Sequence, residues 1–180
     1  ISTAVAASQH WLWHFTRACP CPLPGQTQDE YFSSIVKNEA GSSHHGIDTL
    51  LRILNERRIR ASSKIIRGRY PVVSFSSETP GVLLEGRRFR STLARWDFEP
   101  YAVGIRMEAA KDMGIRPVDY LPSTEFDRLP PADRPYYQRA DDDSIDWRHE
   151  KEWRHVGDVD LPPIRTGEHI LLCPPADICE

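Results

Sequence analysis

Lysine is scarce in this chain, because only four of its 23 basic residues are lysines and the rest are arginines. None of the four lysines has an acidic residue two positions before it, so the acidic-x-Lys pattern of many nucleases is absent. The glycine-rich P-loop and Rossmann signatures, the HExxH zinc motif and the GxSxG serine-hydrolase motif are absent as well. The sequence therefore lacks the common signatures of these large enzyme classes.

Cysteine is also rare, with four residues in a chain of 180. One residue separates Cys19 from Cys21, and five separate Cys173 from Cys179. Neither spacing matches a zinc knuckle, and four thiols do not form a disulfide framework. We therefore expect ordinary thiols, no resident metal and a cytoplasmic location, since the cytoplasm keeps thiols reduced.

Long apolar segments are missing too. No run of 18 apolar residues occurs, so the sequence predicts no membrane span. Residues 1–8 lack the basic segment and the apolar run of a signal peptide. The chain has 39% hydrophobic residues, 27% charged residues and a net charge of −3, which is typical of a folded, water-soluble protein. We expect one domain over residues 1–180, with a flexible start at 1–10 and a long loop at 122–146.

The charges are distributed unevenly along the chain. Between Arg52 and Arg95 there are 11 basic and three acidic residues, whereas 16 acidic and nine basic residues lie between Asp97 and Asp160. Arginine binds phosphate through two parallel hydrogen bonds, so the basic segment is a candidate surface for a nucleotide or nucleic acid. A solvated surface and a coding bias toward arginine explain the same pattern equally well.

Hydrophobic spacing predicts the regular elements. Ile47, Leu50, Leu51 and Leu54 recur at i, i+3, i+4 and i+7, which predicts a helix with one buried side. Shorter helices are predicted at 29–37 and 108–113. Strands are predicted at 11–16, 71–76, 101–106, 117–121, 152–156 and 169–173. Because strands outnumber helices and the helices cluster early, the pattern favours an α+β fold over a doubly wound sheet.

Two short segments are candidates for a catalytic site. One is His14-Phe15-Thr16 in the first predicted strand, and the other is Glu150-Lys151-Glu152-Trp153 in the last third of the chain. The helix at 47–54 and an arginine-rich turn that leads into the strand at 71–76 lie between them. This order resembles the ADP-ribosyltransferase fold, in the branch of DarT-type toxins and related abortive-infection proteins. The resemblance covers about two thirds of the chain and implies a split β-sheet core with a few short helices.

The resemblance implies NAD as the substrate and transfer of ADP-ribose to nucleic acid or protein, in bacterial or phage conflict, with an antitoxin or toxin as partner. Cleavage of the nicotinamide–ribose bond passes through a positively charged ribose, which a fixed carboxylate stabilises. Glu152 is the candidate, but Glu150 would share its face in an extended strand, so periodicity does not separate the two.

Further site residues follow from the same resemblance. His14 would bind a ribose hydroxyl, with Phe15, Thr16 and Ser74 beside it at the cofactor. An arginine between the helix and the second strand would hold phosphate or promote transfer, and Arg67 or Arg69 fits best, with Arg60 behind them. Tyr70 or Trp96 is a candidate for stacking on a nicotinamide or a base.

The chain departs from its relatives by about 30 residues inserted between the first strand and the helix. His44 or His45, just before the N-terminus of that helix, is therefore an alternative to His14. Two other functions remain open. One is a non-catalytic antitoxin or interaction module on the same fold, and the other is a metal-dependent hydrolase that processes nucleic acid.

Overall fold

The computed structural model describes residues 11–18, 21–22, 25–37, 45–93, 95–141, 146–161 and 169–172. The expected flexible start at 1–10 lies outside these residues, as do Cys19, His44, Cys173 and Cys179. None of the helices in the described part of the chain is long and apolar enough to cross a membrane.

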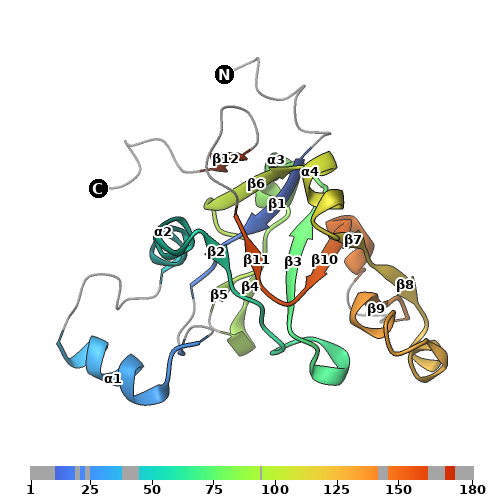
Figure 1. Ribbon diagram of the computed structural model, residues 1–180, viewed down its shortest axis with the longest axis horizontal. Helices are drawn as coiled ribbons and strands as arrows, with labels where there is room; N and C mark the ends of the chain where they lie inside the picture. The colour runs from blue at the N-terminus through green and yellow to red at the C-terminus, as the bar shows by residue number, and fades with distance from the viewer. Residues whose placement is uncertain are drawn as a thin grey trace.

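A six-stranded sheet forms the centre of the molecule, with the strand order β12-β6-β1-β3-β10-β7 and antiparallel pairing throughout (Figure 1). The side chains of β1 (WLWHF) and β6 (AVGIR) are largely apolar, and both faces of these central strands are buried over most of their length. The six strands are β1 (Trp11–Phe15), β3 (Val72–Ser76), β6 (Ala102–Arg106), β7 (Arg116–Pro117), β10 (Glu152–Val156) and β12 (His169–Leu172).

The sheet opens between β1 and β3. Five residue pairs join β1 to β6 and five join β10 to β3, but β1 and β3 share the single pair Trp13↔Ser76. Beyond that pair the His14 side chain bridges the two strands, because its Nδ1 donates to the carbonyl oxygen of Ser74 at 2.9 Å. The His14 side chain thus donates the hydrogen bond that a backbone N–H would donate to Ser74 in a regular β-ladder, and β1 and β3 diverge.

Short α-helices and 3-10 helices flank the sheet in the part of the chain that the structure describes (Figure 1). Helix α2 carries the largest apolar stripe and begins beside β1, where the Thr16 hydroxyl donates to the carbonyl of Gly46 at 2.6 Å. The helices are α1 (Gln28–Val36), α2 (Gly46–Glu56), α3 (Pro80–Glu85), α4 (Met107–Asp112), η2 (Arg67–Arg69), η3 (Ser91–Leu93), η4 (Ser123–Arg128), η5 (Arg134–Tyr136) and η6 (Trp147–Glu150).

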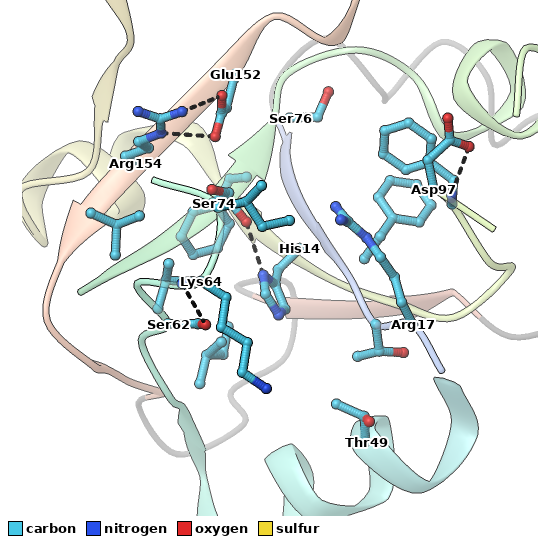
Figure 2. A pocket seen from close by; sticks show the side chains of 18 of the residues that line it. His14, Arg17, Thr49, Ser62, Lys64, Ser74, Ser76, Asp97, Glu152 and Arg154 are labelled. Atoms are coloured by element: carbon cyan, nitrogen blue, oxygen red, sulfur yellow. Dashed lines mark hydrogen bonds and ion pairs between the residues drawn. The ribbon is translucent and has the colours of Figure 1, made fainter. Parts of the chain in front are cut away.

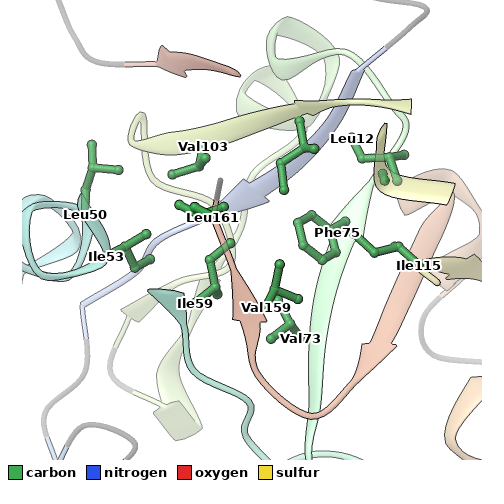
Figure 3. Close-up of a cluster of buried hydrophobic side chains, with 12 residues drawn as sticks. Leu12, Leu50, Ile53, Ile59, Val73, Phe75, Val103, Ile115, Val159 and Leu161 are labelled. Atoms are coloured by element: carbon green, nitrogen blue, oxygen red, sulfur yellow. The ribbon is translucent and has the colours of Figure 1, made fainter. Parts of the chain in front are cut away.

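The described residues also form two-stranded ladders outside the central sheet. They are β2 (Arg58–Ile59) with β11 (Val159–Asp160), β4 (Phe89–Arg90) with β5 (Arg95–Trp96), and the parallel pair β8 (Asp119–Leu121) with β9 (Tyr137–Arg139). The β2–β11 pair and α2 cover one face of the central sheet, where Leu50, Ile59 and Val159 pack against Val73 and Phe75 in the main core (Figure 3). A second cluster, around Trp13 and Phe98, fills the other face of β1.

The structure confirms the mixed composition of strands and few helices and differs from the sequence in its details. The buried stripe of α2 contains Ile53, whereas Leu51, predicted to be buried, is half exposed. The single strand expected at 117–121 is divided between β7 and β8, which belong to different sheets. The loop expected at 122–146 contains η4, η5 and β9, and residues 142–145 of it lie outside the described part.

Candidate functional site

A cavity of about 590 Å³ occupies the opening between β1 and β3 (Figure 2). Side chains far apart in the sequence line it together, from β1, α2, the segment between α2 and β3, the whole of β3, the β4–β5 hairpin and β10. Among the residues singled out from the sequence, His14, Phe15, Thr16, Arg60, Ser74, Glu150 and Glu152 line this cavity. The first strand and the late acidic segment therefore meet at one place.

His14 is held neutral at the mouth of the sheet opening. Desolvation by burial lowers the pKa of His14 to about 4, although the bond to the Ser74 carbonyl acts in the opposite direction. Because Nδ1 carries the proton donated to Ser74, the neutral ring presents the Nε2 lone pair as a hydrogen-bond acceptor. A hydroxyl donor on a ligand is the matching partner.

Glu152 is held by Arg154, its neighbour on the same side of β10. Arg154 donates from Nε to Oε1 at 2.8 Å and from one terminal nitrogen to Oε2 at 2.9 Å. Arg154 is itself buried and donates to the carbonyls of Pro135 and Tyr137 and to the Gln138 side chain. This network fixes the orientation of the Glu152 carboxylate.

Glu150 lines the cavity from a different element than expected. It ends the 3-10 helix η6 instead of extending β10, so the two glutamates are not alternate residues of one strand. Burial raises the pKa of Glu150, the positive charge of Arg17 opposes this shift, and the negative charge of Glu152 adds to it. Lys151 between them has a left-handed backbone and pairs with Glu78 at 2.6 Å.

Arg17 lines the cavity but is not predicted as a site residue from the sequence. It follows the His-Phe-Thr segment directly, and its Nε is buried without a hydrogen-bond partner among the described residues. Burial lowers the pKa of Arg17 and the nearby charge of Arg95 lowers it further, whereas the charges of Glu150, Glu152 and Asp97 act in the opposite direction.

Two further polar atoms on the cavity lining are buried without a partner in the described part of the chain, the indole Nε1 of Trp13 and the hydroxyl of Thr49. An unpaired buried polar group costs about 1–3 kcal/mol, and native structures contain few of them. Together with Arg17, three of the four such atoms belong to this one cavity. All three atoms are enclosed by protein, so they lie behind the surface that a ligand in the cavity would touch.

Four of the predicted site residues lie elsewhere. Arg67 donates to the carbonyl of Ser123 and packs over the Phe126 ring at 4.2 Å, so it joins η2 to η4. Arg69 is exposed in a left-handed turn, and neither arginine lines the cavity. Tyr70 and His45 also lie outside the lining, and His45 stands exposed at the N-cap of α2. The cations that line the cavity are Arg17, Arg52, Arg58, Arg60, Lys64, Arg90, Arg95 and Arg154.

Phe15 and Thr16 reach the cavity but have packing roles as well. Phe15 meets Phe98 edge to face, with ring centroids 5.1 Å apart. The buried hydroxyl of Thr16 positions the start of α2, as described above. No cluster of three metal-binding side chains occurs among the described residues. Comparisons with protein-family models, curated proteins and solved structures gave no match.

Proposed function

We propose that this cavity binds NAD and that the chain is an ADP-ribosyltransferase-like enzyme, acting on nucleic acid or protein in bacterial or phage conflict. One observation carries the proposal. His14 and Glu152, 138 positions apart, line the same cavity at the point where the central sheet splits. A split sheet with a histidine on its first strand and a glutamate on a late strand is the arrangement that the resemblance implies.

The reaction breaks the bond between nicotinamide nitrogen and ribose C1′. The bond electrons leave with nicotinamide, and C1′ becomes electron-poor before the acceptor nucleophile bonds to it. A carboxylate fixed beside the ribose stabilises the developing positive charge without reorganising. Glu152 meets this requirement because Arg154 holds its orientation, and Glu150 adds a second carboxylate at the same cavity.

The rest of the dinucleotide has matching partners in the cavity. The pyrophosphate carries negative charge, and Arg17 with Arg95 supplies two neighbouring guanidinium groups that repel one another in its absence. The Nε2 lone pair of His14 accepts a hydrogen bond from a ribose hydroxyl. These assignments replace Arg67 and Arg69 as the phosphate ligands that the sequence favours.

Isothermal titration of NAD into the wild type and into His14→Ala, Arg17→Gln and Glu152→Gln tests the proposal. Saturable binding that is lost in His14→Ala and Arg17→Gln is the expected result. The matched control is His155→Ala, because His155 is also partly buried and bonds to a backbone carbonyl but does not line the cavity. Absence of binding to the wild type at millimolar NAD would overturn the proposal.

A second function has one observation in its favour. Both oxygens of Glu152 bind Arg154, so Glu152 also serves to join β10 to η5 and β9. A non-catalytic interaction module, such as an antitoxin, would need this contact for the fold alone. Glu152→Gln separates the two functions, since the amide keeps the shape but not the charge. A biological effect that survives in this variant favours the module.

A further inference from the structure

The β4–β5 hairpin at the rim of the cavity presents an unusual distribution of side chains. Arg90 and Arg95 are directly opposite one another in the ladder, and both line the cavity. Phe89 and Trp96 are also directly opposite, with 55% and 42% of their surface exposed. The rings meet edge to face, with centroids 5.6 Å apart. The hairpin therefore turns its arginines inward and its aromatic rings outward.

This arrangement costs stability. Like charges directly opposite in a ladder are unfavourable, and two large aromatic side chains in water forgo the free energy of burial. Asp97 relieves part of the charge by pairing with Arg90 at 3.2 Å, but no described acidic side chain pairs with Arg95. A two-residue ladder that is built against its own stability points to selection for binding.

The arginines of the basic segment 52–95 differ in their partners. Arg52 and Arg60 both pair with Glu56 on α2, Arg58 pairs with Asp160, and Arg67 pairs with Asp127. Arg87 and Arg88 make no such pair with the described carboxylates. The guanidinium of Arg87 lies over the Trp96 ring, 5.2 Å from its centroid. Positive charge therefore accompanies the exposed rings.

We propose that this aromatic hairpin, defined by Arg87, Arg88, Phe89 and Trp96, is a docking surface for single-stranded nucleic acid that delivers the acceptor to the cavity. As an acceptor surface it rests on the proposed transferase function. The bases stack on Phe89 and Trp96, and the phosphates pair with the two arginines. Arg95 and Thr92, which line the cavity on the same hairpin, connect this surface with the proposed reaction site.

Size and charge favour a nucleic acid strand over a protein partner. A stable protein interface buries about 800 Å² on each side, whereas two exposed rings and two arginines suffice for one or two nucleotides. The strand must be single because the faces of paired bases are stacked within a duplex and do not reach a protruding side chain.

Fluorescence anisotropy with short labelled single-stranded DNA, single-stranded RNA and duplex DNA tests the surface. We expect Trp96→Ala and Phe89→Ala each to weaken single-strand binding by at least about fivefold, as loss of one stacking contact does. Arg87→Ala is expected to weaken binding and to reduce its dependence on salt. The control is Phe32→Ala, because Phe32 on α1 is also 55% exposed and lies outside the hairpin.

The same variants are titrated with NAD, which separates the two proposals. Intact NAD binding with unchanged oligonucleotide affinity in Trp96→Ala and Phe89→Ala would overturn the docking surface and leave the transferase proposal in place. If the wild type does not bind NAD but binds the oligonucleotide in a way that depends on Trp96, the transferase proposal alone would be overturned. Tighter binding of the duplex than of either single strand would contradict stacking. A conservative Trp96→Phe variant keeps a ring and should retain most of the affinity.

Discussion

At the scale of single residues, the neutral histidine in the sheet opening gives a pH dependence with a definite sign. Folding lowers the pKa of His14 from 6.5 to about 4, so the unfolded chain binds the proton more tightly between these values. The contribution of His14 to the free energy of unfolding is therefore fully present above pH 6.5. It falls by about 3 kcal/mol as the pH drops toward 4.

The variant His14→Asn should remove this dependence, because asparagine keeps an N–H donor for Ser74 and does not titrate. Urea unfolding at several pH values between 4 and 7 measures it, and the difference between variant and wild type isolates His14 from other groups. If the free energy of unfolding depended on pH in the same way in both proteins, the pKa of His14 would not be lowered by folding, and the prediction would be contradicted.

Glu150 illustrates the opposite sign at the same site. Burial raises its pKa, so the folded protein favours the protonated carboxyl, and ionisation at neutral pH costs stability. Glu150→Gln should therefore raise the melting temperature at pH 7, and this gain should disappear at acid pH. Thermal melts with the exposed Glu85→Gln as control measure the effect. A lower melting temperature at pH 7 would mean that attraction to Arg17 outweighs burial.

At the scale of elements, α2 provides a direct comparison between a buried and an exposed leucine. Leu50 is 1% exposed and belongs to the main core, whereas its neighbour Leu51 is 50% exposed. Leu50→Ala should lower the free energy of unfolding by about 2–5 kcal/mol, because it leaves a cavity under the helix. Leu51→Ala should change it by less than about 0.5 kcal/mol. Equal losses in urea unfolding would contradict the assigned face of the helix.

The elements that the sequence predicts well are those whose burial is continuous along the chain. Strands β1, β3 and β6 are largely apolar runs bounded by turns, whereas β10 is mostly polar. The bounds of all four strands agree with prediction to within a residue or two. The change of partner after Pro117 left no signal, since β7 and β8 share the composition of a single strand. Helix α3 carries a signal that was overlooked, because Thr79 caps it and Pro80 occupies its first turn.

The residues of the candidate site also differ in how far the sequence predicts them. His14 and Glu152 were accessible to sequence reasoning because short motifs surround them. Arg17 and Arg95 were not, since their convergence depends on how the β4–β5 hairpin lies against β1, which no local pattern encodes. The position of Arg67 and Arg69 outside the cavity has the same origin. Their position between helix and strand suggested the site, but aromatic packing of η2 against η4 directs Arg67 away from it.

Arg154 links elements that are adjacent only in the fold. It is 2% exposed and holds β10 to η5 and β9 through Glu152, two carbonyls and Gln138. Arg154→Met should destabilise the protein by about 3–5 kcal/mol, because Glu152 is left partly buried without its partner. The double variant with Glu152→Met should recover part of this loss in urea unfolding. No recovery would show that the carbonyl contacts, and not the ion pair, carry the stability.

At the scale of the whole molecule, the cavity is bounded by residues from Trp13 to Arg154, so only the native fold contains it. A ligand that binds there must stabilise the folded state, by about 2.7 kcal/mol at a hundredfold excess over its dissociation constant. For a chain of 180 residues this corresponds to an increase of roughly 5–10 °C in melting temperature.

This increase in melting temperature can be used to isolate the contribution of the pyrophosphate to binding. ADP-ribose contains the pyrophosphate that Arg17 and Arg95 would bind, whereas adenosine contains a ribose but no phosphate. We expect ADP-ribose to raise the melting temperature of the wild type and to lose most of this effect in Arg17→Gln, while any smaller effect of adenosine persists. Equal shifts in both proteins would place the pyrophosphate away from Arg17. The cationic pair would then be explained by attraction to Glu150, Glu152 and Asp97, which also line the cavity.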